Sequence, residues 1–199
     1  MKEVRKLDIQ FRTEETDDKM EIKGYAVVFN SPETYGYTEV ISDRALDNAD
    51  MSDVVLRYNH NDTFMVLART RNKSLNLNVD EKGLFMDATL QNDITEHRNI
   101  YNAIKSGLID KQSFAFSIDE DEYDYDTDTR TITKIGKLYD VSVVDQPFYN
   151  ATDVSLASKN DDFMERRAEL RKEHEEKIEQ ERKAEELRKL KDEVLAKLG

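Results

Sequence analysis

The sequence predicts an α+β protein that is mostly β: a small antiparallel β-barrel surrounded by helices, followed by a long C-terminal α-helix. Short segments in which apolar and polar residues alternate recur along most of the chain, as in half-buried strands. The last part, residues 161–199, has no proline and no glycine before its final residue, and helix formers dominate it. We therefore predict a barrel domain over residues 1–157 and a charged helical tail over residues 158–199.

The expected strands follow one another at even spacing. They cover residues 4–11, 20–30, 54–58, 65–70, 75–79, 84–90 and 131–144. Residues 71–73 and 80–83 have the composition of hairpin turns. Ser42 is a suitable N-cap for a short helix over residues 43–48. Many short strands with one or two helices favour a barrel or sandwich that has its helices outside.

The stretch around Ser113 organises the middle of the chain. Residues 94–106 have apolar residues at helical spacing, and Gly107 follows where a helix needs a left-handed residue. Residues 114–118 then alternate, which predicts a half-buried strand. Ser113 therefore begins a strand directly after a helix and a turn, where a rigid backbone holds its hydroxyl in place. Serine at a strand start is also a common turn residue.

The tail is predicted to be one long helix that is solvated along its middle. Glu–Lys pairs at i,i+4, such as 179/183 and 185/189, support it by about 0.2–0.5 kcal/mol each. Apolar residues are sparse until Leu187 and then gather toward the end, without three clean heptads. A solvated appendage and a docking device for a partner helix both fit this pattern.

Composition and charge exclude several classes of protein. The 199 residues carry a net charge of −13, which argues against binding to nucleic acid or to anionic membranes. There is no cysteine, so neither disulfides nor thiolate chemistry is available. The first residues are charged, unlike a signal peptide, and the apolar runs are too short to cross a bilayer. We therefore expect a cytoplasm-like compartment.

Metal and cofactor sites are not expected. No second histidine or cysteine stands at ligand spacing from any of the three histidines. Asp124, Asp126 and Asp128 match the first ligands of an EF-hand loop. Its sixth position is Thr129 instead of glycine, however, and its twelfth is Ile135 instead of glutamate. Residues 119–128 are therefore expected to form a solvated hairpin with no bound calcium.

The histidines differ in their surroundings. His174 lies in the charged tail, and His97 stands between Glu96 and Arg98, so both are expected to be solvated. His60 instead ends an apolar strand. A histidine at a strand end is usually structural, but it is also the residue type that works as a general base near neutral pH.

A nucleophilic serine needs a base within hydrogen-bond reach and a third group that orients the base. Ser113, His60 and Asp140 are the candidates. Asp140 interrupts an otherwise apolar strand, residues 138–144, and a carboxylate in such a place needs a partner. No Gly-x-Ser-x-Gly elbow is present, which excludes an α/β-hydrolase.

The order and surroundings of these three residues resemble the prohead maturation proteases of tailed bacteriophages, which are related in fold to the herpesvirus assemblins. Four blocks carry the resemblance: residues 24–30, 56–84, 107–116 and 138–147. The sequence departs from the family pattern at three positions. Ala68 precedes Arg69 where relatives commonly have glycine, Ala115 replaces the glycine of Ser-Phe-Gly-Phe, and Asp140 stands where the phage enzymes often have glutamate.

The resemblance implies a serine endopeptidase in the immature capsid, in the host cytoplasm and inside the phage prohead. Ser113 would be the nucleophile, His60 the base and Asp140 the orienting acid. A backbone N–H near Ser113, or the side chain of Arg69, would stabilise the oxyanion. The substrates would be the scaffolding segment of the major capsid protein or a scaffold protein, and the enzyme itself.

No cofactor, no nucleic-acid partner and no membrane partner are expected, and analogy with the assemblins implies a homodimer. The tail would either dock on scaffold or be a pro-segment removed by self-cleavage. The main rival hypothesis is a non-enzymatic assembly protein that uses the barrel as a binding module and the C-terminal helix as a scaffold. A second rival is a cation-binding domain built on the acidic hairpin.

Overall fold

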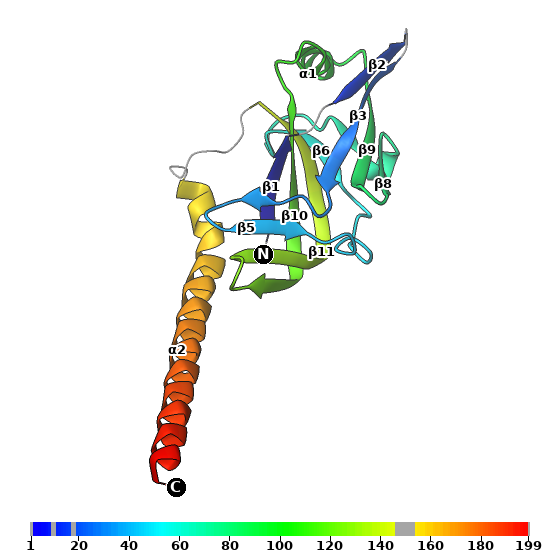
Figure 1. The fold of residues 1–199 in the computed structure, drawn as a ribbon. Coiled ribbons are helices and arrows are strands. Elements are labelled where there is room, and N and C mark those ends of the chain that lie inside the picture. The colour runs from blue at the N-terminus through cyan, green and yellow to red at the C-terminus, as the bar shows by residue number, and fades with distance from the viewer. Residues whose placement is uncertain (1, 9–10, 17–18, 146–153, 199) are drawn as a thin grey trace. The chain divides into compact units, whose positions relative to one another are not determined.

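The computed structural model describes residues 2–8, 11–16, 19–145 and 154–198 (Figure 1). The chain divides into two units, Met1–Tyr149 and Asn150–Gly199. The elements are, in chain order, β1 (Lys2–Asp8), β2 (Arg12–Thr16), β3 (Lys19–Val28), β4 (Glu33–Thr34), β5 (Thr38–Ile41), β6 (Val55–Tyr58), β7 (Ala68–Arg69), the 3₁₀-helix η1 (Thr70–Asn72), β8 (Leu75–Val79), β9 (Gly83–Leu90), α1 (Thr95–Lys105), β10 (Lys111–Asp124), β11 (Thr129–Val144) and α2 (Val154–Leu198).

Two open sheets replace the predicted barrel. Among the described residues, one sheet has the order β1-β10-β11-β5-β4, with β6 beside β11 and β7 beside β6. The other has the order β2-β3-β9-β8. The mostly β class and the long C-terminal helix are confirmed, but the barrel is wrong because neither sheet closes on itself. Alternation in a sequence shows which face of a strand is buried, and it does not show which strands pair.

The β10–β11 hairpin forms the centre of the larger sheet, and the strands β1, β5 and β6 pair with it (Figure 1). β11 is long enough to pair with two further strands along one edge. Thr129–Ile132 pair with β5, and Asp140–Val143 pair with β6, both in parallel. Most of the other strand pairs are antiparallel, as the sequence predicts, and these two are the exceptions among the named strands. These parallel pairings bring residue 58, at the end of β6, beside residue 143.

The strand that carries Ser113 is more deeply buried than expected. Residues 112–116 of β10 are all buried, so the predicted half-buried alternation is wrong. β10 is an inner strand between β1 and β11, and the rings of Phe114 and Phe116 stack in the core with centroids 4.9 Å apart. A register shift between Ala115 and Phe116 bends the hairpin just beyond Ser113.

Local predictions were partly right. The helix α1 and the left-handed Gly107 that follows it, with φ +74°, are confirmed. Residues 43–48 form successive turns instead of a helix, although the Arg44 N–H does bond the Ser42 hydroxyl. Residues 65–70 contain only the two-residue strand β7, because the chain enters η1 at Thr70.

Gly83 is the glycine whose substitution is expected to cost most. Its φ is +156°, and a Cβ placed there would lie 2.0 Å from the Val27 carbonyl oxygen. Gly83→Ala should therefore lower the free energy of unfolding by at least about 3 kcal/mol, measured by chemical denaturation. Gly36→Ala is the matched control: its φ is +79° but no atom lies within 4 Å, so about 1 kcal/mol is expected. Equal losses would contradict the steric argument.

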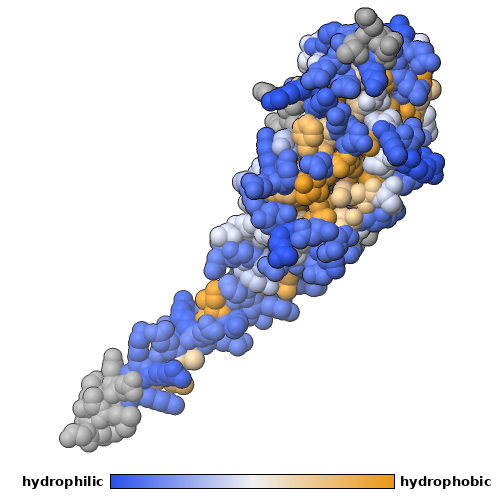
Figure 2. Space-filling view, turned by 90° about the vertical axis from the view of Figure 1, so that its right-hand side faces the viewer, coloured by the Kyte–Doolittle hydropathy of each residue, from blue (hydrophilic) through white to orange (hydrophobic). Residues whose placement is uncertain are grey.

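The second unit contains α2, which is mostly polar. Figure 2 shows hydrophilic side chains over most of the helix, interrupted by a few hydrophobic ones. Two hydrophobic residues of α2, Ile178 and Leu187, are about half exposed. The predicted pairs Glu179–Lys183 and Glu185–Lys189 are confirmed, with N–O distances of 3.3 and 2.9 Å. Within the described residues, neither helix combines the length and apolar character needed to cross a membrane.

Candidate active site

Three side chains from three distant segments meet beside the β10–β11 hairpin. His60 Nε2 lies 2.6 Å from Ser113 Oγ, and His60 Nδ1 hydrogen-bonds Asp140 Oδ1. The His60 ring is thus bonded at one nitrogen to a hydroxyl and at the other to a carboxylate. This is the arrangement of a nucleophile, a base and a group that orients the base. The structure therefore brings together all three residues that the sequence singled out as a candidate triad.

His60 reaches this place through the parallel pairing of β6 with β11. Beyond Tyr58 the chain turns sharply: the Asn59 N–H bonds the Val143 carbonyl, and Asn59 and His60 both have positive φ, 52° and 53°. Two successive non-glycine residues in the left-handed region are uncommon and cost conformational energy. The turn carries the imidazole back over β11 to Asp140.

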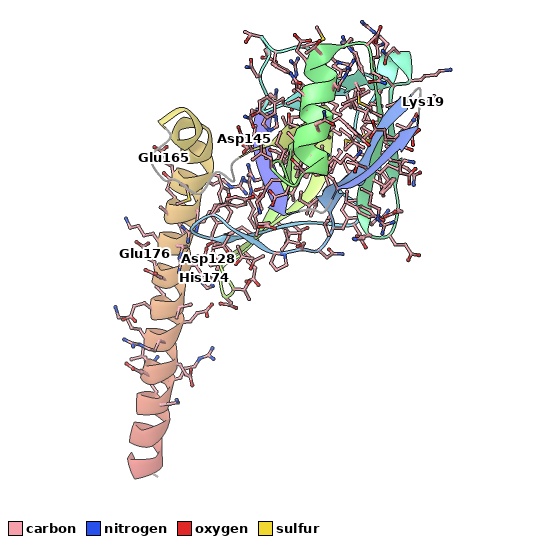
Figure 3. The ribbon with its side chains drawn as sticks, turned by 90° about the horizontal axis from the view of Figure 1, so that it is seen from above. Lys19, Asp128, Asp145, Glu165, His174 and Glu176 are labelled. Carbon is pink, nitrogen blue, oxygen red and sulfur yellow. The ribbon has the colours of Figure 1, made fainter. Side chains whose placement is uncertain are left out.

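Asp145 holds this turn from the end of β11. Its carboxylate accepts hydrogen bonds from the Tyr58 hydroxyl at 2.6 Å and from the Asn59 side-chain amide at 2.9 Å. Its own N–H bonds the Asn59 side-chain oxygen at 3.2 Å. Figure 3 labels Asp145 beside the strands of the first unit. Asp145 therefore fixes the residues immediately before His60 in the chain.

Asp140 is 1% exposed and remains an anion because cationic or hydrogen-bonding groups surround its carboxylate. Burial by itself would raise its pKa, but the hydrogen bond and charge of His60, and those of Lys2, outweigh burial and hold the pKa below its ordinary value. Lys2 Nζ lies 2.9 Å from Asp140 Oδ2. The carboxylate that the sequence marked as needing a partner thus has a partner at each oxygen.

Ser142 is a residue of this site that the sequence reasoning missed. Its hydroxyl donates to Asp140 Oδ1 at 3.1 Å, accepts the His60 backbone N–H at 3.2 Å, and lies 3.2 Å from His60 Nδ1. It is fully buried. The sequence did contain a sign of this role. Side chains alternate between the two faces of a strand, so residues 140 and 142 share one face of β11. Ser142 positions both His60 and Asp140.

Ser142→Ala is expected to lower kcat of peptide cleavage about tenfold with KM unchanged, because one buried hydrogen bond to the carboxylate and one to the His60 backbone are lost. Ser142→Thr keeps the hydroxyl and should recover most of the rate. Steady-state kinetics on the two variants, with thermal midpoints to verify folding, check this. An alanine variant as fast as the wild type would show that Ser142 does not position the site.

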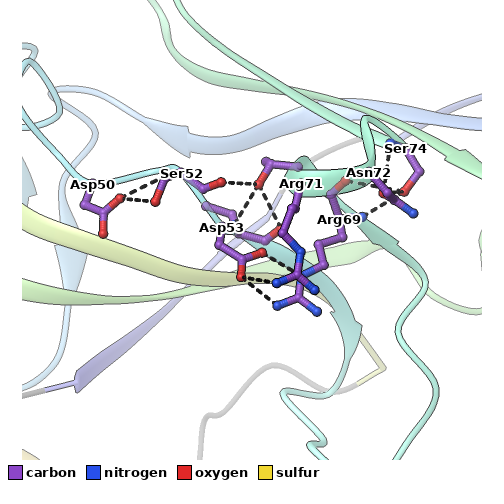
Figure 4. A network of polar contacts seen from close by, with 9 residues as sticks. Asp50, Ser52, Asp53, Arg69, Arg71, Asn72 and Ser74 are labelled. Atoms are coloured by element: carbon purple, nitrogen blue, oxygen red, sulfur yellow. Dashed lines mark hydrogen bonds and ion pairs between the residues drawn. The ribbon is translucent and has the colours of Figure 1, made fainter.

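Arg69 lies in another polar network (Figure 4). Its Nε and Nη2 donate to the two carboxylate oxygens of Asp53 at 2.6 and 2.7 Å. Its backbone N–H bonds the Ser74 hydroxyl. Among the hydrogen bonds of the described residues, none joins the Arg69 side chain to Ser113, His60 or Asp140. The oxyanion role of Arg69 therefore stays a prediction.

His97 corrects the expectation of a solvated side chain. It is 3% exposed, its Nε2 bonds the Val66 carbonyl at 3.0 Å, and its Nδ1 accepts the Gln91 N–H at 3.1 Å. It lies three and seven residues before Ile100 and Ile104 and shares the buried face of α1 with them. His97 therefore has a structural role, linking α1 to the segments before it.

The acidic β10–β11 turn is internally bonded. Asp124 accepts the Asp126 N–H at 2.9 Å and the Thr127 hydroxyl at 2.8 Å, and Asp128 accepts the Tyr123 hydroxyl. Over the described residues, no three His, Cys, Asp or Glu side chains are grouped as metal ligands. The carboxylates here stabilise the turn.

Comparison with protein families gives one match. A family model described as caudovirus prohead serine protease matches residues 7–167 and so includes His60, Ser113 and Asp140. No curated protein and no solved structure matches the chain significantly.

Proposed function

The chain belongs to the caudovirus prohead serine proteases, and from this premise we propose that Ser113 is its nucleophile, His60 its general base and Asp140 the carboxylate that orients His60. The observation that carries the proposal is the His60 ring, which is hydrogen-bonded to Ser113 at one nitrogen and to Asp140 at the other. As a prohead protease, the protein is a serine peptidase that acts in the prohead inside the host cell.

The proposed reaction has two stages. Ser113 Oγ attacks the substrate carbonyl carbon while His60 Nε2 takes the hydroxyl proton; the peptide C–N bond then breaks, and His60 gives the proton to the leaving amine. Water, deprotonated by His60, next attacks the acyl-enzyme; the ester bond to Ser113 Oγ breaks, His60 returns the proton to that oxygen, and the new carboxyl end is released. Asp140 holds the ring with Nε2 toward Ser113 and stabilises the imidazolium that forms. A buried carboxylate does this well because little water screens it.

The substrates we propose are the scaffolding segment of the major capsid protein or a separate scaffold protein, and the enzyme itself. The family supports action on capsid proteins; the particular segment, self-cleavage, the assemblin-like dimer and the oxyanion donor are expectations. Co-expression with the phage's capsid and scaffold proteins, followed by mass mapping of fragments, tests the proposal. We expect discrete cuts with the wild type and none with Ser113→Ala. Identical fragments from both would refute the assigned nucleophile.

For α2 we propose a docking role on helical scaffold, with removal as a pro-segment as the other possibility. The helix presents charged side chains along its length, including Glu165 and Glu176 (Figure 3), as a reversible docking surface would. Deleting residues 161–199 should lower incorporation into proheads at least about tenfold, because the helix no longer raises the local concentration of enzyme. Quantitative blotting of purified proheads measures this. If the deletion variant is incorporated as well as the wild type, and the wild-type enzyme is found cleaved on the N-terminal side of α2, the pro-segment hypothesis is favoured.

A further inference from the structure

The N-terminal strand lies directly against the proposed nucleophile. β1 pairs antiparallel with β10, and residue 6 stands opposite Ser113. The Ser113 hydroxyl donates a hydrogen bond of 2.7 Å to the Arg5 carbonyl oxygen. Ser113 is fully buried. A substrate carbonyl therefore has no access to Ser113 Oγ while β1 is in this place.

The Arg5 carbonyl competes with His60 for the Ser113 proton. A hydroxyl has one proton, and a carbonyl oxygen has none to give. While the Ser113 hydroxyl donates to the Arg5 carbonyl, its proton is not donated to His60 Nε2, which lies 2.6 Å from Ser113 Oγ. Displacement of β1 would remove this competing acceptor.

Two further contacts hold β1 at the site. Lys2 Nζ binds the carboxylate of Asp140, as described above. The Arg5 guanidinium binds Glu39, with an Nη2–Oε2 distance of 2.8 Å, and Glu3, with an Nη1–Oε2 distance of 3.0 Å. Arg5 and Glu39 are both buried. If β1 left, Glu39 would keep the longer contact with Arg130, at 3.4 Å, and lose the closer pair with Arg5, which is costly for a buried carboxylate.

We propose that β1 is a displaceable blocking strand, and that the edge of β10 it covers is where an extended substrate segment docks, with a basic side chain taking the place of Arg5 beside Glu39. This rests on the proposed catalytic role of Ser113. A substrate strand that pairs with β10 restores the backbone hydrogen bonds that β1 gives up. A basic side chain on that strand restores the charge pair with Glu39. The free enzyme then reacts only through the fraction of molecules in which β1 has left.

Locking β1 tests the proposal in the full chain. Val4 stands opposite Ala115 across β1 and β10, and the natural chain has no cysteine, so the only disulfide that Val4→Cys/Ala115→Cys can form within one chain is the intended one. The readout is covalent labelling of Ser113 by a fluorophosphonate probe, which needs an accessible, activated serine but no substrate. We expect the oxidised variant to label at least about 100-fold more slowly than the same variant after reduction.

Two further variants complete the test. Val4→Pro removes an N–H from β1 and should weaken its pairing, so labelling should become about tenfold faster than in the wild type. Asn76→Cys/Asp87→Cys places a matched crosslink between β8 and β9 in the other sheet. This control should label at the same rate before and after reduction.

A peptide experiment tests the basic side chain. A free peptide with the sequence of residues 2–8, KEVRKLD, should protect Val4→Pro from the probe, and the same peptide with Arg5→Glu should need at least about tenfold higher concentration. Equal protection by both peptides would show that a basic side chain beside Glu39 is not needed for binding.

The possible results distinguish two hypotheses: that β1 blocks the site, and that Ser113 is the nucleophile. If the oxidised and reduced forms of Val4→Cys/Ala115→Cys label equally fast, β1 does not block the site, while Ser113 remains the nucleophile. If folded Val4→Pro and the wild type both fail to label at Ser113, the catalytic role itself fails, and the blocking strand with it.

Discussion

Ser113→Ala and His60→Ala are each expected to lower the rate of peptide cleavage by about 10⁴ to 10⁶-fold, with the fold intact. Alanine at 113 removes the attacking oxygen, and alanine at 60 removes the group that takes its proton. The double variant should be no slower than either single one, because the two side chains act as a unit. Cleavage of a peptide taken from the mapped capsid-protein site, followed by mass spectrometry, measures the rates.

Ser117→Ala is the matched control for this prediction. Ser117 lies on the same strand as Ser113, four residues further along, and its hydroxyl accepts the Lys137 N–H at 3.1 Å, away from His60. Its loss should change the rate by less than about twofold. If Ser113→Ala retained activity, or if Ser117→Ala lost as much as Ser113→Ala, the assignment of the nucleophile would be wrong.

Asp140→Asn is expected to lower kcat about 10⁴-fold. The amide has nearly the shape of the carboxylate, but it has no charge to stabilise a His60 imidazolium, and its NH₂ group can turn the ring to the unproductive tautomer. KM should stay within a few-fold, because Asp140 is not expected to contact substrate. Kinetics and a thermal midpoint within a few degrees of the wild type check the result. If the variant kept more than about a tenth of the wild-type rate, Asp140 would not be the orienting carboxylate of the triad.

The carboxylate of Asp140 is also expected to make the free energy of unfolding fall at low pH. Its folded-state pKa lies below the ordinary value of 3.8, through His60 and Lys2 acting against burial. Its contribution to the free energy of unfolding is therefore fully present above pH 3.8 and is lost as the pH falls through the folded-state pKa. Denaturation of the wild type and of Asp140→Asn across this window should show a shallower acid dependence in the variant.

The sequence predicted the longer strands but missed β2, β4 and β5, and it did not predict which strands pair. Alternation and turn composition located the β8–β9 and β10–β11 hairpins, since both depend on neighbouring residues. The parallel pairing of β11 with β5 and with β6 joins segments about eighty or more residues apart, and no local pattern records it. The barrel prediction was wrong for this reason.

The residues of the candidate site were also predicted only in part. Ser113, His60 and Asp140 were identifiable because each has an unusual sequence setting and their order resembles a known family. Ser142 and Asp145 were not singled out, because a serine in a strand and an aspartate after one have many ordinary roles; for Ser142 only its place on the same face as Asp140 pointed to the site. His97 was misread because its charged neighbours at 96 and 98 masked its place on the buried face of α1.

The parallel pairing of β6 with β11 also sets an order on the assembly of the proposed site during synthesis. His60 is made long before β11 (Thr129–Val144), the strand that carries Asp140. A nascent chain that ends before Asp140 lacks the carboxylate that hydrogen-bonds His60. If the three proposed residues are catalytic, we expect cleavage only from chains whose translation has passed β11.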